Sequence, residues 1–531
     1  MSSGPVGSSR HDAPPGAVAR PFWRRIAWPA IALAALLRLH GAGALPLSGD
    51  EAYHWEWSRH LAGAYYDHPG MTAWLIALAT ACLPDAGEVA VRLPAMLSML
   101  LAAALAHGFA RDVARARGVE AGAAAEAGCL AAALVFFVPL PAALSVYMST
   151  DPPLIPLWLG ASWALFAALQ RGSTGAWLAC GLSLGLAAST KLISLQLVAT
   201  IGAFLVATRA GRAWLRRPQP WLALGVALVA ATPMLVWNAT HDWLTFRFNF
   251  DIRQRAQHAS PWHPVVFVAG QLACLTPGFA VLAVLACLRR RLAAPLATAA
   301  MLCVLVPLAG FALVSLRREV GAHWTAAPWT GALVLLAVAF ALRDPWTGRR
   351  WARVAWRGSW ALSLVVLAAA HAFAAAPHAF ARLEVAGGQP RRVLRNLFGW
   401  PEVGRAVAAA CAALRAEPDS QGVFVAAGQY GTAAAIAFYT PGRPQVALWG
   451  ALRNHGRSYA QWDDWAALRG RDAVFVSKRP LADWEVRLLQ ERFAVVGPVE
   501  RIPITVGGEE GNAFYLVRCR RFDGRPPFDP V

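Results

Sequence analysis

Long apolar stretches, separated by short polar loops, run through the first 376 residues of the chain. A helix needs roughly 20 mainly apolar residues to cross the hydrocarbon core of a bilayer. By that measure we predict spans at residues 26–43, 91–110, 121–141, 152–170, 174–189, 192–208, 219–237, 264–288, 295–315, 323–342 and 358–376. The pattern therefore predicts an α-helical polytopic membrane protein, with about eleven transmembrane helices within a domain formed by residues 20–376.

One further apolar stretch, residues 71–83, is too short to cross a bilayer. Counting it as a span would invert every later loop against the distribution of arginines described below. We therefore expect a re-entrant or interfacial helix there.

The pattern changes after residue 376, where apolar runs shorten and charged and turn residues return. Short β-rich runs alternate there with helical patterns, which predicts a small soluble α/β domain over residues 377–531. The predicted strands are residues 423–427, 473–477 and 514–517, and the predicted helices are 401–415, 431–438 and 481–492. Residues 1–19, rich in Ser, Gly and Pro, predict a disordered tail.

Charge placement gives the chain an orientation, because Lys and Arg concentrate in the cytoplasmic loops of membrane proteins. Arginines cluster before the first span and in alternate loops, at 111–117, 171, 209–217, 289–291 and 343–357. We therefore expect a cytoplasmic N-terminus and an extracytoplasmic domain at residues 377–531. The net charge of +19 then reflects orientation and attraction to anionic headgroups. It gives no support for nucleic-acid binding.

The composition fits this setting, with 57% hydrophobic residues and 24 Trp. Of the eight cysteines, Cys411 and Cys519 fall in the predicted outer domain, and the sequence leaves their pairing open. No Cys/His cluster has the spacing of a zinc site. The sequence also has no phosphate-binding loop, so it predicts no nucleotide site.

The loop after the first span carries most of the candidate chemistry. Asp50 and Glu51 lie side by side there, followed by Arg59 and by Asp67-His68-Pro69. A carboxylate can remove a proton from an attacking hydroxyl, and cations can bind a phosphate. The loop therefore predicts an enzyme that acts on a substrate carried by a lipid.

Capping is the plain alternative for two of these acids. Ser48 and Glu51 match the S-x-x-E capping box, and Asp151 stands just before Pro152, where a capping residue is common. Both functions are compatible, because a helix N-terminus beside a site also favours an anion. Asp50 and Asp151 are predicted on the same side of the membrane.

Basic side chains on that side are candidates for binding phosphate. Lys191 lies where two apolar spans meet, which is a functional hypothesis by default, with snorkelling to the interface as the alternative. Arg253 and Arg255 lie in an outer loop, against the inside bias, and a basic interfacial helix would explain them equally well. His323, next to Trp324, opens the tenth span, where an interfacial pair is the common case.

Several of these segments resemble a known group of enzymes. SGDEAYHWEWSRHLAGAYYDHPGMTAWLI, residues 91–94 (VRLP), SVYMSTDPPLIPLWLGASWALF and GLAASTK together resemble glycosyltransferase family 39 and related GT-C membrane enzymes. These include protein O-mannosyltransferases, the aminoarabinose transferase of lipid A and the rhizobial galacturonosyltransferases. The likeness covers residues 26 to about 340 as a layout and is sharpest in the first loop and around Asp151.

The resemblance implies an inverting transfer of a sugar from a polyprenyl-phosphate donor, on the extracytoplasmic face of a bacterial inner membrane. The implied acceptor is a glycolipid such as lipid A, a glycan or a protein. By position, Asp50 is then the base, Glu51 contacts sugar or acceptor, and Asp151 is a second acid. His68 stands where the lipid A enzymes have a Lys that contacts the lipid phosphate. Asp67 matches a position where those relatives allow a divalent cation, but we assign no metal site.

A polytopic transporter or lipid flippase is the alternative from another class. Transporters place ionisable groups near the bilayer midplane and often contain internal repeats. In this sequence the acids lie at the loop ends of spans, and no repeat is apparent. The enzyme is therefore the favoured interpretation.

Overall fold

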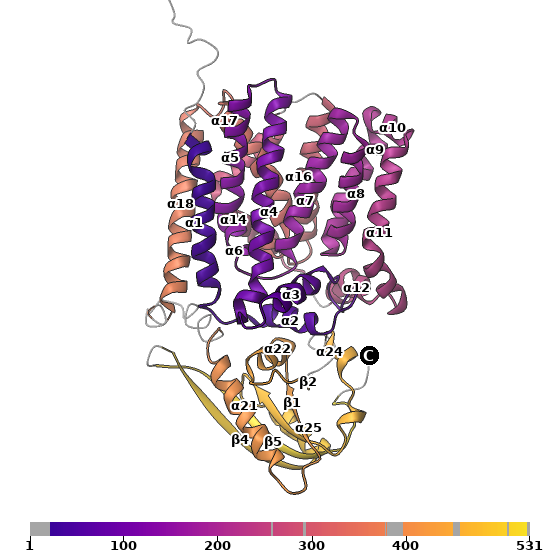
Figure 1. Ribbon diagram of the computed structural model, residues 1–531, viewed down its shortest axis with the longest axis vertical. Helices are drawn as coiled ribbons and strands as arrows, with labels where there is room; N and C mark the ends of the chain where they lie inside the picture. Colours follow the sequence, from indigo (N-terminus) through magenta and orange to yellow (C-terminus); the bar gives the residue numbers. More distant parts are fainter. Residues whose placement is uncertain are drawn as a thin grey trace, which may run out of the picture.

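The computed structural model describes residues 22–255, 259–289, 294–377, 379, 397–449, 457–506 and 509–527. A bundle of long helices stands above a smaller domain that contains a β-sheet (Figure 1). The predicted fold class, a helical polytopic membrane protein with a small C-terminal α/β domain, is therefore confirmed. The predicted tail, residues 1–19, lies outside the described residues.

Every predicted span contains a helix. The bundle helices are α1 (Phe22–Ala42), α4 (Gly87–Ala116), α5 (Ala121–Phe137), α7 (Asp151–Arg171), α8 (Thr174–Ala188), α9 (Leu195–Ala207), α11 (Pro218–Thr240), α14 (His263–Leu275), α15 (Pro277–Leu288), α16 (Ala294–Ser315), α17 (Ala326–Ala341) and α18 (Arg350–Ala375). Shorter helical segments are α6 (Pro139–Leu144), η1 (Leu192–Ser194), α10 (Arg209–Leu215), α12 (Leu244–Arg247), η2 (Phe248–Ile252), α13 (Arg253–Arg255) and η3 (Ala322–Thr325).

The count of eleven transmembrane helices is not confirmed. Within the described ranges, six helices are long and apolar enough to cross a membrane, or up to eight if each of two bent pairs is one span. One such pair is α14 and α15, which meet at an angle of 97°. Pro277 explains this break, because a proline disfavours helical backbone at the residue before it, and Thr276 has a φ of 75°. The predicted span 264–288 is therefore divided.

Small residues let the bundle helices approach closely. A Cβ atom on Gly181 or Gly185 of α8 would lie 2.1 or 2.3 Å from a backbone carbonyl oxygen of α11. Close approach of this kind is typical of helix packing in membranes, where burial of apolar surface does not drive association.

Two short helices, α2 (Gly49–Arg59) and α3 (Met71–Cys82), lie across one end of the bundle, between it and the C-terminal domain (Figure 1). Helix α3 occupies the apolar stretch that was predicted to be too short to span. Its position fits the expected interfacial helix.

The C-terminal domain has one five-stranded sheet in the order β2-β1-β3-β5-β4. The first three strands are parallel, whereas β5 pairs antiparallel with both β3 and β4. The strands are β1 (Val423–Ala427), β2 (Val446–Leu448), β3 (Asp472–Ser477), β4 (Phe493–Val506) and β5 (Glu509–Phe522). The helices are α21 (Trp400–Arg415), α22 (Tyr430–Tyr439), α24 (Tyr459–Trp462), η4 (Ala466–Leu468) and α25 (Asp483–Arg492). The three predicted strands and three predicted helices are confirmed.

The membrane part and the C-terminal domain share one hydrophobic core. Trp55 and Trp57 of α2 belong to the same buried cluster as Val403 of α21 and Ile436 of α22. Cys411 lies in this cluster, whereas Cys519 lies in a separate one, and both thiols are free. The domain is therefore packed firmly on α2.

Candidate active site

A cavity of about 920 Å³ lies where α2, the N-terminal end of α7, η1 and α13 meet the C-terminal domain. Apolar residues such as Phe248 and Phe311 form part of its wall. The charged and titratable side chains that line it are Asp50, His54, Asp67, His68, Tyr147, Asp151, Lys191, Arg253, His323 and Arg457. The structure thus gathers seven of the ten residues predicted from the sequence, and it leaves Glu51, Arg59 and Arg255 outside the lining.

Asp50 reaches the cavity from the first turn of α2. The Ser48 hydroxyl accepts a hydrogen bond from the Glu51 N–H at 3.2 Å and so fixes the start of this helix. One carboxylate oxygen of Asp50 accepts a hydrogen bond from the Tyr430 hydroxyl, 2.8 Å away. The side chain is exposed to the cavity. Asp50 is therefore placed to meet a substrate.

Glu51, in contrast, is 1% exposed and has protein partners for both oxygens. It closes the capping box by accepting from the Ser48 N–H at 3.0 Å. It also forms a two-point ion pair with Arg92, at 2.7 and 2.8 Å, and Arg92 donates to three carbonyls of the preceding loop. This geometry supports the capping interpretation of Glu51 and gives it no contact with the cavity.

Asp151 and Lys191 form a buried ion pair, 2.7 Å between Oδ1 and Nζ. Lys191 is 6% exposed, at the break between α8 and η1, so it does not snorkel to an interface. The capping interpretation of Asp151 is not supported, because Thr150 is the N-cap of α7 and has no side-chain capping bond. His323 lies near the pair, with Nε2 3.8 Å from the other Asp151 oxygen.

Asp67 forms the second ion pair of the cavity, 2.7 Å from the guanidinium of Arg457. Arg457 comes from the C-terminal domain and also lies 3.8 Å from the Tyr430 ring centre. Burial raises the pKa of Asp67, although the Arg457 charge opposes this. Among the described residues, no three His, Cys, Asp or Glu side chains could hold a metal. One Asp67 oxygen is thus paired with Arg457, whereas the other is buried without a hydrogen-bond partner.

The two histidines beside Asp50 are neutral at physiological pH. Burial lowers the pKa of His54 to about 4 and the pKa of His68 well below its usual range. A neutral His68 cannot supply positive charge to a phosphate. Positive charge in this cavity comes from Lys191, Arg253 and Arg457 instead.

Arg253 stacks on Trp324, 4.6 Å from the ring centre. Within the described part of the chain, Asp50 and Arg253 are the charged lining residues without an ion-pair partner. Arg255, two residues on, is 79% exposed and pairs with Asp251. Arg59 pairs with Glu56 and donates to the Arg443 carbonyl, so it connects α2 to the C-terminal domain.

Four lining or adjoining residues were not singled out from the sequence: His54, Tyr147, Tyr430 and Arg457. His54 lies one helical turn after Asp50, so the spacing could have indicated it. Tyr430 and Arg457 lie about 380 and 390 positions from their partners along the chain, and no local signal connects them.

The cavity can therefore hold an anionic group and present a base to it. Asp50 is the candidate base, and the cations Lys191, Arg253 and Arg457 are the groups that would stabilise negative charge on a departing group. A pocket of this size is within the range of small-molecule sites.

Parts of the chain are similar to known proteins. Residues 67–237 match the family described as dolichyl-phosphate-mannose-protein mannosyltransferase. A curated relative, the lipid A galacturonosyltransferase RgtD of Rhizobium johnstonii, is 34% identical over 203 residues, which cover 38% of this chain and 41% of RgtD. The chain thus matches less than half of the length of that relative.

The whole fold is shared with ArnT from Cupriavidus metallidurans. The crystal structure of ArnT bound to undecaprenyl phosphate superposes with a TM-score of 0.60 at 18% identity, covering 94% of this chain and 98% of ArnT. The apo structure gives the same TM-score at 17% identity. The chain is thus an integral, multi-pass membrane protein. The chain thus resembles these proteins in fold over nearly its whole length and in sequence over residues 67–237.

Proposed function

We propose that this protein transfers a sugar from a polyprenyl-phosphate donor to an envelope acceptor, with inversion, on the extracytoplasmic face of a bacterial inner membrane. The main support for the proposal is which charged residues of the cavity form ion pairs and which do not. Two carboxylates are neutralised by cations, whereas Asp50 and Arg253 have no ion-pair partner among the residues described. The reaction requires a base, which Asp50 can provide, and a cation that binds the phosphate, which Arg253 can provide.

In this reaction Asp50 accepts the proton of the acceptor hydroxyl while its oxygen attacks the anomeric carbon. The bond between that carbon and the phosphate oxygen breaks, and polyprenyl phosphate leaves with the bonding electrons. Arg253, Lys191 and Arg457 stabilise the charge on the departing phosphate. Tyr430 donates to Asp50 and so orients its carboxylate.

The relatives support the identity of the substrates. RgtD is named as a lipid A galacturonosyltransferase, and ArnT was crystallised with undecaprenyl phosphate. We propose a polyprenyl-phosphate sugar as the donor here, and lipid A or another glycolipid, a glycan or a protein as the acceptor. Deleting the gene in its host should remove one sugar from an envelope molecule, which mass spectrometry would identify.

The Asp50→Asn variant tests the mechanism. The amide preserves the shape and can still accept the Tyr430 hydrogen bond, but it cannot take a proton at neutral pH. We expect transfer to fall roughly a hundredfold or more, whereas binding of polyprenyl phosphate should be unchanged. Turnover would be measured with purified protein in nanodiscs. Turnover close to that of the wild type would rule out Asp50 as the base.

A further inference from the structure

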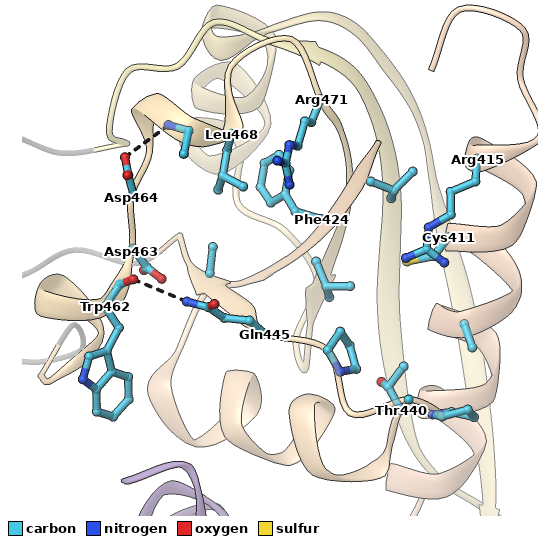
Figure 2. Close-up of a pocket in the computed structure, with 18 residues that line it drawn as sticks. Cys411, Arg415, Phe424, Thr440, Gln445, Trp462, Asp463, Asp464, Leu468 and Arg471 are labelled. Atoms are coloured by element: carbon cyan, nitrogen blue, oxygen red, sulfur yellow. Dashed lines mark hydrogen bonds between the residues drawn. The ribbon is translucent and has the colours of Figure 1, made fainter. Parts of the chain in front are cut away.

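A second cavity, of about 500 Å³, lies inside the C-terminal domain between α21, β1 and the segment 462–471 (Figure 2). None of its lining residues belongs to the first cavity. Its floor is buried and includes Cys411, Phe424 and Thr440, whereas Gln445 and Asp464 are exposed at the rim. It is therefore a pocket that solvent can enter, and the transfer reaction leaves it without a role.

Charges of both signs line this pocket. Arg415 and Arg471 are exposed at the rim, and within the described ranges their guanidiniums have no hydrogen-bond or ion-pair partner. Asp463 accepts from the Leu448 N–H at 2.9 Å, and Asp464 accepts from the Ala467 N–H at 3.1 Å. Each aspartate uses one oxygen and keeps the other available. Figure 2 shows both aspartates on one side of the pocket and Arg415 on the other, on α21.

A buried hydroxyl also points to a ligand. Thr440 is 3% exposed, lines the pocket and has no hydrogen-bond partner for its Oγ1. A buried polar group without a partner destabilises the fold, and a bound polar molecule would supply the missing hydrogen bond. Phe424, Pro441 and Pro444 provide apolar surface next to these polar groups.

The pocket is linked to the first cavity through α2. Pro444 and Trp462 line the pocket, and both contact the C-terminal end of α2: Arg59 donates toward the Pro444 carbonyl at 3.5 Å, and His60 stacks on Trp462 at 4.4 Å. Asp50 lies at the other end of this helix of 11 residues. Asp50 and Arg59 are thus separated by roughly 14 Å along α2.

We propose that this pocket binds an acidic sugar of the acceptor, a ring bearing a carboxylate or a phosphate and lying some distance from the ring that is glycosylated. The inference rests on the proposed function. Guanidiniums without partners match a carboxylate or phosphate, and free carboxylate oxygens match sugar hydroxyls. The apolar wall suits the C–H face of a sugar ring. An acceptor with several sugar rings would reach both sites.

Matched sugars test the proposal on the full-length protein in nanodiscs. Galacturonate, galactose 1-phosphate, galactose and inorganic phosphate would be compared by saturation-transfer NMR and calorimetry. We expect at least one of the two acidic sugars to bind at least tenfold more tightly than galactose, and the one that binds identifies the acidic group. Equal binding of inorganic phosphate and galactose 1-phosphate, together with no binding of galacturonate, would overturn the assignment to a sugar.

Variants of the lining residues test whether the acidic sugar binds in this pocket. Replacing both arginines, Arg415→Ala with Arg471→Ala, should weaken binding of the acidic sugar by roughly tenfold or more. The control is Arg469→Ala, an exposed arginine on the same segment that does not line the pocket. It should bind as the wild type does. An unchanged affinity in the double variant would contradict the proposal.

The Asp50→Asn variant separates this inference from the proposed function. If the Asp50→Asn variant no longer transfers a sugar but still binds the acidic sugar in the pocket, the result supports the inference independently of the transfer reaction. A wild-type protein that transfers a sugar but binds none of the acidic probes overturns the inference and leaves the function intact. Binding of the probes by a protein that uses no polyprenyl-phosphate donor would instead contradict the proposed function.

Discussion

Two adjacent carboxylates at the start of α2 have entirely different surroundings. Asp50 faces the cavity, whereas Glu51 faces away from it and joins Arg92 to the helix start and to Met148 of the loop before α7. Neighbouring positions on a helix point about 100° apart, so adjacency in sequence does not imply a shared task. The acidic pair that drew attention in the sequence thus contains one candidate base and one structural anchor.

Replacing the anchor should damage stability rather than chemistry. In Glu51→Gln the buried Arg92 loses its ion pair, and breaking such a pair costs about 3 to 5 kcal/mol. We expect a clear fall in the melting temperature in detergent, measured by intrinsic fluorescence. The Asp50→Asn variant is the matched control and should melt like the wild type. Equal melting temperatures of all three proteins would contradict the anchoring role.

Arg253 and Arg255 offer a matched test of the donor phosphate site. Arg253 lines the cavity without an ion-pair partner there, whereas Arg255 is exposed and paired with Asp251. Arg253→Ala should weaken binding of polyprenyl phosphate by roughly ten- to a hundredfold, because a charge-assisted hydrogen bond is lost. Arg255→Ala should change it little. Calorimetry in nanodiscs gives both values, and equal effects of the two variants would place the phosphate elsewhere.

At the scale of the element, two glycines, Gly49 and Gly431, allow α2 and α22 to pack closely. A Cβ on Gly431 would lie 3.2 Å from the Gly49 Cα, closer than side chains normally pack. Both glycines adjoin site residues, Asp50 on one helix and Tyr430 on the other. The separation of these helices therefore sets the distance between the candidate base and its hydrogen-bond donor.

Gly431→Val should push the two helices apart and misplace Asp50. A displacement of about 1 Å at a reacting group can reduce the rate by up to a hundredfold, so we expect a tenfold to hundredfold fall in turnover. The control is Ala413→Val on the exposed side of α21, which should be active. Full activity in both variants would show that the close contact is not needed for catalysis.

Much of the element level could be predicted from sequence. Apolar length indicated the bundle helices, and alternation and turn residues indicated three strands of the sheet, because these signals are local. The division between α14 and α15 depends on Pro277, a local signal that the length of the apolar stretch does not reveal. The contribution of Arg457 and Tyr430 to the cavity could not be predicted, because it follows from packing the C-terminal domain on α2.

At the scale of the whole molecule, the described arginine-rich loops, such as 111–117 and 209–217, and the C-terminal domain lie at opposite ends of the bundle (Figure 1). Arg117 pairs with Asp344 at the end away from α2, between the loops that follow α4 and α17 (Figure 1). We propose that this end is cytoplasmic and that residues 377–531 lie outside.

Alkaline phosphatase fusions test this orientation, because the reporter is active only outside the cytoplasm. Fusions after residues 115 and 213 should be inactive, and a fusion after residue 376 should be active, since Arg-rich loops stay on the cytoplasmic side. Green fluorescent protein fused at the same three points gives the reciprocal signal. Equal phosphatase activity at 213 and 376 would refute the topology.

The shared core of α2 and the C-terminal domain also bears on how the enzyme matures. The loop that carries Asp50 is synthesised early, whereas Val403 and Ile436, which complete its core, are synthesised some 350 residues or more later. Until the C-terminal domain has folded, Trp55 and Trp57 lack their packing partners and the cavity lacks Arg457. Chains that lack this domain would therefore have an incomplete cavity, and we expect them to be inactive in transfer.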